Sequence, residues 1–306
     1  MPSELAQDHQ IERERLAHAT ARLAARLWRE IDTDNLAADW TRKVHRVAAL
    51  VAAGQLEAAR QADPYLAELL VDAESVGQVN AEALSGIASD GRDLTDLLMY
   101  PVWSALSALR RGLSLAAALV SGQALLDLLA RTMVSDAGRA ADLIAMAARP
   151  AVTSYVRVVE LPACARCIIL AGREYGLSTG FQRHPRCDCT MEPVTANYKP
   201  DIVSPEAVYE SMSPAERRKA FGEVGMEAID QGADIAQVVN ARRGMTTATR
   251  YGRTVEATTE GQTRRGLTRG RRPNGAPRLM PEEIMRIAGD DRDEAIRLLT
   301  RNGYII

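Results

Sequence analysis

Residues 164–189 read CARCIILAGREYGLSTGFQRHPRCDC, and this stretch contains all four cysteines of the chain and one of its four histidines. A C-x-x-C piece lets two thiolates reach one ion from a tight turn, and cysteines two apart on an extended strand point the same way. A structural Zn²⁺ site takes four nitrogen or sulfur ligands. The stretch therefore predicts a structural zinc site, with one ligand to spare among five candidates: Cys164, Cys167, His184, Cys187 and Cys189.

Other uses of four clustered cysteines stay open. Two disulfides would satisfy the count, although no signal peptide precedes the stretch to indicate an oxidising compartment. A redox C-x-x-C of the thioredoxin type would need no second cysteine cluster. A catalytic zinc is disfavoured, because the stretch lacks a carboxylate base at the spacing of H-E-x-x-H, and Asp188 is too close to its cysteine neighbours for that role.

Strand patterns flank the cysteines on both sides. Thr153–Glu160 alternates and is rich in β-branched residues, Cys167–Leu170 continues toward a second strand, and Met191–Val194 suits a return strand. A hairpin this small buries little apolar surface, so a bound zinc would supply folding energy. We therefore expect residues 151–198 to form a zinc-stabilised β-hairpin module.

The preceding 150 residues have a helical pattern. The chain is 46% hydrophobic but only 4% aromatic, which favours closely packed helices built from Ala, Leu and Val. Leu113–Ala130 is mostly apolar, but it contains Gln123 and Asp127, so we interpret it as a buried bundle helix and expect no membrane contact. The fold class predicted for the whole chain is mainly α, of the α+β type.

The first helix should span residues 3–31, with Ser3 as its cap. Its narrow apolar stripe suits docking onto another helix, so residues 1–150 are the expected partner-binding region. The stripe consists of Leu16, Leu23, Leu27 and Ile31. Asp34 is the expected cap of a second helix that Gly54 would stop.

The N-terminal region shows no catalytic pattern. Phosphate-binding and dinucleotide-binding glycine motifs are absent, and His9, His18 and His45 have no acidic or cysteine partner at a recognisable spacing. We therefore expect residues 1–150 to lack a cluster of polar groups, and the chain to have no catalytic residues and no small-molecule substrate.

Beyond residue 198 the chain has three parts. Residues 199–241 are a helical segment in which Ser204 and Ser213 precede prolines at helix starts. Residues 280–306 are a short helix pair. The intervening residues 242–279 are arginine-rich: 242–278 hold ten arginines against two glutamates, 10 − 2 = +8. We expect an extended or weakly ordered arm that binds nucleic acid through its phosphates or lies on an acidic protein surface.

Two adjacent arginine pairs are the expected nucleic-acid contacts of this arm. They are Arg264, Arg265, Arg271 and Arg272. Their contacts should be non-specific, because a guanidinium fork recognises phosphate rather than base sequence. A solvated linker is the alternative interpretation.

The cysteine box also carries a family resemblance. A strand Tyr155–Glu160, then Leu161-Pro162, C-A-R-C at 164–167, L-A-G at 170–172 and H-P-R-C-D-C at 184–189 resemble the MuF-like minor head proteins of tailed bacteriophages. The similarity covers residues 151–198, and Phe221–Met245 reads like head proteins of actinobacterial phages. Asp188 departs from the family, which often has Arg there, so a nucleic-acid contact at that position is not expected.

The resemblance implies a virion role that composition and spacing do not reveal. It implies a structural minor head protein, present in few copies inside the capsid, that associates with the portal protein and packaged DNA during head morphogenesis or genome delivery. Its location would be the virion head interior, and the host cytoplasm during assembly. The competing hypotheses are a zinc-containing DNA-binding protein and a cysteine-box enzyme, either a nuclease or a thiol-redox catalyst.

Overall fold

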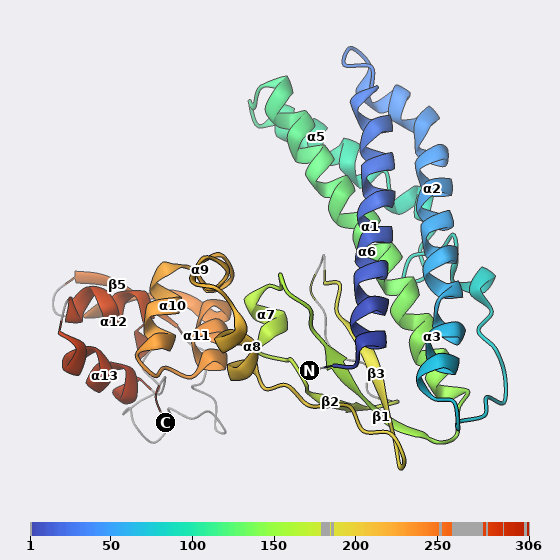
Figure 1. Cartoon of the computed structure of the whole chain (residues 1–306). Helices are drawn as coiled ribbons and strands as arrows, with labels where there is room; N and C mark the ends of the chain where they lie inside the picture. Colours follow the sequence, from blue (N-terminus) through green and yellow to red (C-terminus); the bar gives the residue numbers. More distant parts are fainter. Residues whose placement is uncertain are drawn as a thin grey trace. The chain divides into compact units, whose positions relative to one another are not determined.

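A computed structural model describes residues 2–178, 184, 187–250, 253–258, 278–279, 281–289, 291–302 and 305 (Figure 1). The structure is 63% helix and 9% strand, which confirms the mainly α, α+β class. The chain forms two compact units. Unit 1 contains Met1–Glu160 and Gly172–Ile202, and unit 2 contains Leu161–Ala171 and Val203–Ile306. Unit 1 thus combines the predicted helical region with most of the predicted β-module.

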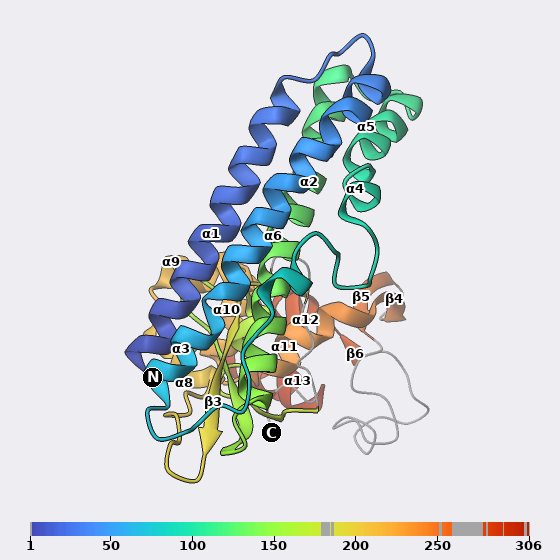
Figure 2. The same ribbon diagram turned by 90° about the vertical axis from the view of Figure 1, so that its right-hand side faces the viewer.

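The helices of unit 1 form a bundle in which three long members lie side by side (Figures 1 and 2). These are α1 (Glu4–Arg29), α2 (Leu36–Arg60) and α6 (Leu115–Ala147). The shorter elements are α3 (Ala62–Leu69), the 3-10 helix η1 (Ala81–Leu84), α4 (Leu94–Leu97) and α5 (Tyr100–Arg110).

Small side chains let these helices approach closely. Ala17, Ala21 and Ala24 of α1 are buried, whereas Leu23 is 42% exposed. The predicted leucine stripe was therefore wrong as the main contact face: of its four members only Leu27 and Ile31 are buried. Burial follows the alanine positions because a methyl group allows a shorter distance between helix axes than a leucine does.

Two tryptophans fill the wider end of the bundle. Trp28 and Trp40 meet edge to face at 4.8 Å between ring centroids, and each indole N–H donates to a backbone carbonyl. Gly122 makes room for Trp28, since a Cβ there would lie 2.3 Å from the indole ring. Such a contact explains a glycine inside a 33-residue helix, where it would otherwise cost about 1 kcal/mol relative to alanine.

Two predicted boundaries of α2 differ from the observed ones. The cap position is Asn35 rather than Asp34, and the helix passes through Gly54 to end at Arg60. Gly54 faces Thr20, whose hydroxyl would lie 2.5 Å from an added Cβ, so this glycine marks a close helix crossing and not a helix stop.

Helix α6 is the one helix among the described residues that is long and apolar enough to cross a membrane by length and composition, which is weak evidence for a span. It packs against α1, α2 and α5. Only 33% of its apolar window is buried, so the prediction of a buried helix holds for part of its length.

A three-stranded antiparallel sheet of order β2-β1-β3 completes unit 1. Strand β1 (Val152–Val158) pairs with β2 (Glu174–Gly176) on one edge and with β3 (Thr190–Thr195) on the other. Strands β1 and β3 confirm the two predicted strands, although burial does not alternate: Tyr155–Val158 of β1 are buried on both faces. The expected strand at Cys167–Leu170 was wrong, because Ala165–Ile168 forms the short helix α7 and the second strand begins at Glu174.

Unit 2 is a set of short helices with local caps. They are α8 (Pro205–Ser211), α9 (Pro214–Phe221), α10 (Glu223–Asp230), α11 (Ile235–Ala241), the 3-10 helix η2 (Arg242–Gly244), α12 (Pro281–Ala288) and α13 (Arg292–Arg301). The hydroxyls of Ser204 and Ser213 accept from backbone N–H groups as predicted, and Ser213 forms a capping box with Glu216. Gly222, at φ 73°, separates α9 from α10.

Unit 2 also contains a second antiparallel sheet, of order β4-β5-β6. Its strands are β4 (Met245–Arg250), β5 (Arg253–Thr258) and β6 (Arg278–Leu279). Of the two expected forms of this arm, extended or weakly ordered, β4 and β5 adopt the extended one, and Ala257 and Thr258 are fully buried. The threonines and Val255 suit a pleated strand, and this β-propensity outweighs the charge of the arginines at the strand ends.

Candidate metal centre

The C-x-x-C piece adopts one turn of helix. Cys164 is the cap residue of α7, and its carbonyl accepts from the N–H groups of Cys167 at 2.9 Å and Ile168 at 3.0 Å. The turn is local, so the spacing of the two cysteines is sufficient to form it. Cys164 is exposed and Cys167 is buried.

The second cysteine pair lies immediately before β3. Cys187 donates its backbone N–H to the carbonyl of His184 at 3.0 Å, and the chain enters the strand at Thr190. Cys187 and Cys189 are each 1% exposed. The two-residue spacing places both sulfurs on one side, as the sequence predicted, although the residues precede the strand.

The ligand atoms of all five candidates gather into two groups that share Cys167. Cys164, Cys167 and His184 form one group, and Cys167, Cys187 and Cys189 form the other; within each group the ligand atoms lie within 4.8 Å of one another. Sulfurs bound tetrahedrally to zinc at about 2.3 Å would be about 3.8 Å apart, which is compatible with the spacing within each group of three. The residues fit a metal ion, and sulfur-rich ligands favour zinc among common divalent ions.

Two buried arginines surround the Cys187–Cys189 pair. Arg157, on β1, places Nη2 3.3 Å from Sγ of Cys187 and 3.6 Å from Sγ of Cys189. Arg139, on α6, donates Nη1 to the carbonyls of the same two cysteines at 2.9 and 3.2 Å. Its Nη2 is 2.5 Å from a carboxylate oxygen of Asp136. The sequence pattern of the cysteine box did not reveal either arginine, because each lies 30 or more residues before Cys187 along the chain.

Asp188 lies between the two cysteines and is half-buried. Burial, together with the negative charge of Glu14, raises the pKa of its carboxyl to about 6.

A second polar cluster lies inside the helical bundle, where none was expected. His9 Nε2 is 3.2 Å from both oxygens of Asp142, and Arg13 Nη2 is 2.8 Å from Oδ1 of the same carboxylate. The His9 ring also stacks on Tyr65 at 3.9 Å. No recognisable spacing could identify this partner of His9, because Asp142 follows it by 133 residues and only helix packing joins them. The prediction was wrong for His18, whose Nε2 lies 3.4 Å from Glu14, four residues earlier.

Burial and charge act in opposite directions in this cluster. Burial alone would raise the pKa of Asp142, but the charges of Arg13 and His9 outweigh it and hold that pKa below its ordinary value. Burial lowers the pKa of Arg13 despite Asp142, and burial raises the pKa of Tyr65 well above its ordinary value. With His9 5% and Asp142 0% exposed, the cluster has no access to a substrate and is structural.

Gly138 provides the space that Arg13 occupies. A Cβ at this position would lie 1.5 Å from Nη1 of Arg13. We expect Gly138→Ala to destabilise the protein by about 1–3 kcal/mol, although glycine to alanine within a helix ordinarily stabilises. Chemical denaturation measures the difference. The control is Ala140→Gly at a half-buried position of the same helix, which should lower the free energy of unfolding by about 1 kcal/mol. A Gly138→Ala variant more stable than the wild type would contradict the expectation.

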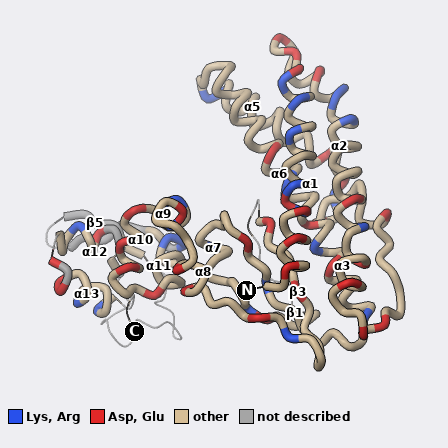
Figure 3. The backbone as a smooth tube through the Cα atoms, viewed as in Figure 1, with Lys and Arg blue, Asp and Glu red and all other residues tan. Residues whose placement is uncertain are grey.

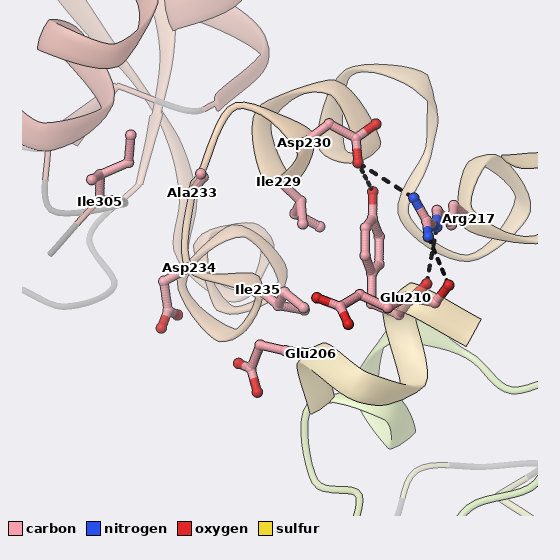
Figure 4. Close-up of a pocket in the computed structure, with 11 residues that line it drawn as sticks. Glu206, Glu210, Arg217, Ile229, Asp230, Ala233, Asp234, Ile235 and Ile305 are labelled. Atoms are coloured by element: carbon pink, nitrogen blue, oxygen red, sulfur yellow. Dashed lines mark hydrogen bonds and ion pairs between the residues drawn. The ribbon is translucent and has the colours of Figure 1, made fainter. Parts of the chain in front are cut away.

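A pocket of about 520 Å³ in the described part of unit 2 has an acidic rim (Figure 4). Its carboxylates are those of Glu206, Glu210, Asp230 and Asp234. Asp230 accepts from the Tyr209 hydroxyl at 2.9 Å and lies 3.7 Å from Arg217. Burial and this hydrogen bond raise the pKa of Tyr209. The charge of the rim disfavours phosphates, so this pocket is no candidate for nucleic-acid contact.

The predicted nucleic-acid contacts lie outside the described residues. They are Arg264, Arg265, Arg271 and Arg272. Comparison of the chain with protein-family models, curated proteins and solved structures finds no match.

Proposed function

We propose that this chain is a structural minor head protein of a tailed bacteriophage, stabilised by one zinc ion and without enzymatic activity. The observation that carries the proposal is the convergence of the cysteine box. The five candidate ligands, which also carry the resemblance to MuF-like proteins, gather into two groups of ligand atoms that share Cys167. A structural ion is favoured because three of the four cysteines are buried.

Limited access to the polar clusters supports a role without enzymatic activity. The described histidine–aspartate pair in unit 1 is buried under helices, and the pocket of unit 2 has carboxylates without a nucleophile paired to a base. A thiol-redox role is disfavoured because Cys167 belongs to a group of three close cysteine sulfurs, together with Cys187 and Cys189, and a redox C-x-x-C needs no second cysteine pair.

A partner surface is supported by α5 rather than by the predicted stripe on α1. Tyr100 and Trp103 are 44% and 46% exposed and contact each other edge to face at 5.0 Å. In Figure 3 this helix is almost entirely tan, the colour of uncharged residues, with blue for positive charge at one end. Exposed aromatics with few charges are typical of interface cores. In this proposal α5 meets the portal protein, and Trp103 belongs to the interface.

The location tests the proposal. Purified heads of the phage that encodes this chain should contain it in far fewer copies than the major capsid protein, which quantitative mass spectrometry of gradient-purified particles measures. The gene should lie next to the portal gene. Recovery of the protein only in the soluble lysate, with none in heads or procapsids, would reject the virion role and favour the DNA-binding or enzymatic hypotheses.

The arginine-rich segment should supply non-specific DNA contacts. Neutralising Arg264, Arg265, Arg271 and Arg272 to glutamine should reduce the slope of log K against log salt by up to about 4, since each phosphate contact contributes about 0.9. Fluorescence anisotropy over a salt series measures the slope. Glutamine at exposed Arg42 and Arg60 is the control, because both arginines already pair with carboxylates. A wild-type chain with no DNA affinity at low salt would contradict the prediction.

A further inference from the structure

Arg157 is one of the largest fully buried side chains, at 1% exposed. A guanidinium keeps its positive charge at every relevant pH, and burying a charge is unfavourable unless other groups compensate. Sulfur atoms of both Cys187 and Cys189 lie within hydrogen-bonding range of one nitrogen of this group. A neutral thiol is a weak acceptor, whereas a thiolate is a strong and negative one.

A metal-bound form explains this arrangement. Zinc with three thiolates and one neutral histidine carries one net negative charge, and zinc with four thiolates carries two, so a buried site needs a nearby cation in either case. Arg139 is less suited to that task because Asp136 pairs with it at 2.5 Å and its other nitrogen holds the two cysteine carbonyls. The two arginines thus contact different atoms of the same cysteines. Arg139 donates to their backbone carbonyls, and Arg157 faces their sulfurs.

We propose that Arg157 is a positioning residue of the zinc centre, which donates to the Cys187 and Cys189 thiolates and offsets one of their charges. The inference rests on the proposed metal centre and adds to it a residue outside the cysteine box. It also implies that Cys187 and Cys189 both bind the ion. With Cys167 as the third ligand, either Cys164 or His184 is the fourth.

The test compares zinc affinities of full-length variants by competition with a chromophoric chelator. Arg157→Met keeps the apolar stem but removes the charge and the donors, and we expect its zinc Kd to rise about 10–100-fold, as for other residues that contact metal ligands. Arg157→Lys, which keeps the charge on a single nitrogen, should recover part of the affinity.

Arg149→Met is the matched control. Arg149 is also a buried arginine of unit 1, at 4% exposed, but it donates to the carbonyl of Ala145 and lies near Asp63. Arg149→Met should lower stability while leaving the zinc Kd of the folded protein unchanged. In the Co²⁺-substituted protein, Arg157→Met should shift the thiolate-to-metal charge-transfer bands, and Arg149→Met should not.

The outcomes separate this inference from the proposed centre. A wild-type protein without zinc would reject the centre itself. Zinc bound by the wild type, with an Arg157→Met Kd within twofold of it and unchanged cobalt bands, would reject only the role of Arg157. If Arg157→Met does not fold, Arg157→Gln decides: it keeps an N–H donor without the charge, and an unchanged Kd would overturn the charge compensation.

Discussion

Replacing Cys167 with serine should abolish zinc binding and lower the melting temperature of the protein by about 8–16 °C. Cys167 is the residue common to both groups of ligand atoms, so its loss leaves neither group complete. A metal present at 1,000 times its Kd stabilises the folded state by about 4 kcal/mol, and each kcal/mol shifts the melting temperature of a domain this size by roughly 2–4 °C. Elemental analysis and calorimetry measure the two effects.

Chelator treatment of the wild type is the control for this substitution and should give the same melting temperature as Cys167→Ser. Comparison of Cys164→Ser with His184→Gln then identifies the remaining ligand, because only the residue that binds the ion should reduce the zinc content when replaced. Wild-type protein that contained no zinc, and whose thiol titration showed cysteines joined as disulfides, would contradict the prediction.

The second large effect concerns the buried ion cluster of unit 1. Asp142→Asn should destabilise the protein by about 3–5 kcal/mol, because it leaves the Arg13 guanidinium, 4% exposed, without a negative partner. Chemical denaturation at neutral pH measures the loss. The joint replacement Arg13→Met with Asp142→Leu removes both charges, and it should recover much of the stability that Asp142→Asn loses.

The pH dependence follows from the lowered pKa of Asp142. A carboxyl whose folded pKa is depressed stabilises the protein fully above its unfolded pKa, near 4, and loses this contribution as the pH falls through the folded value. Wild-type stability should therefore fall more steeply below pH 4 than that of Asp142→Asn, which has already lost the contribution.

An exposed pair provides the control for this prediction. His18 and Glu14 lie 3.4 Å apart on the same helix, with more than a third of each side chain in solvent. Glu14→Gln should change stability by less than about 1 kcal/mol. A similarly small effect of Asp142→Asn would show that the buried cluster contributes no more than a surface pair.

The role of α1 changes how the partner surface can be tested. Ala6, Ala24 and Trp28 of this helix are core residues, and the backbone N–H of Ser3 donates to the buried carboxylate of Glu192 in β3. Deleting residues 1–31 would therefore disrupt unit 1 itself. Point substitution of exposed Trp103 tests partner binding without that loss.

Much of the fold was predictable because it depends on neighbouring residues. Hydroxyl caps at Ser3, Ser204 and Ser213 satisfy N–H groups three residues away, so the serines mark helix starts without knowledge of the rest of the chain. The alternation of β1 and the cysteine spacing were likewise local signals. In contrast, the strand pairing of β4 and β5 was missed, since their arginines suggested a solvated arm.

By itself, the sequence determined the helical class, the helix starts at Ser3, Ser204 and Ser213, strands β1 and β3, and the set of candidate metal ligands, since each depends on residues a few positions apart. Only the tertiary structure decided which face of α1 is buried, that His9 and Arg13 meet Asp142, and that Arg157 faces the cysteine sulfurs. These contacts join residues 30 to 133 positions apart. Which residues meet in these contacts depends on how closely small side chains allow the helices and strands to pack. The sequence pattern along one element does not specify the distance to the element packed against it.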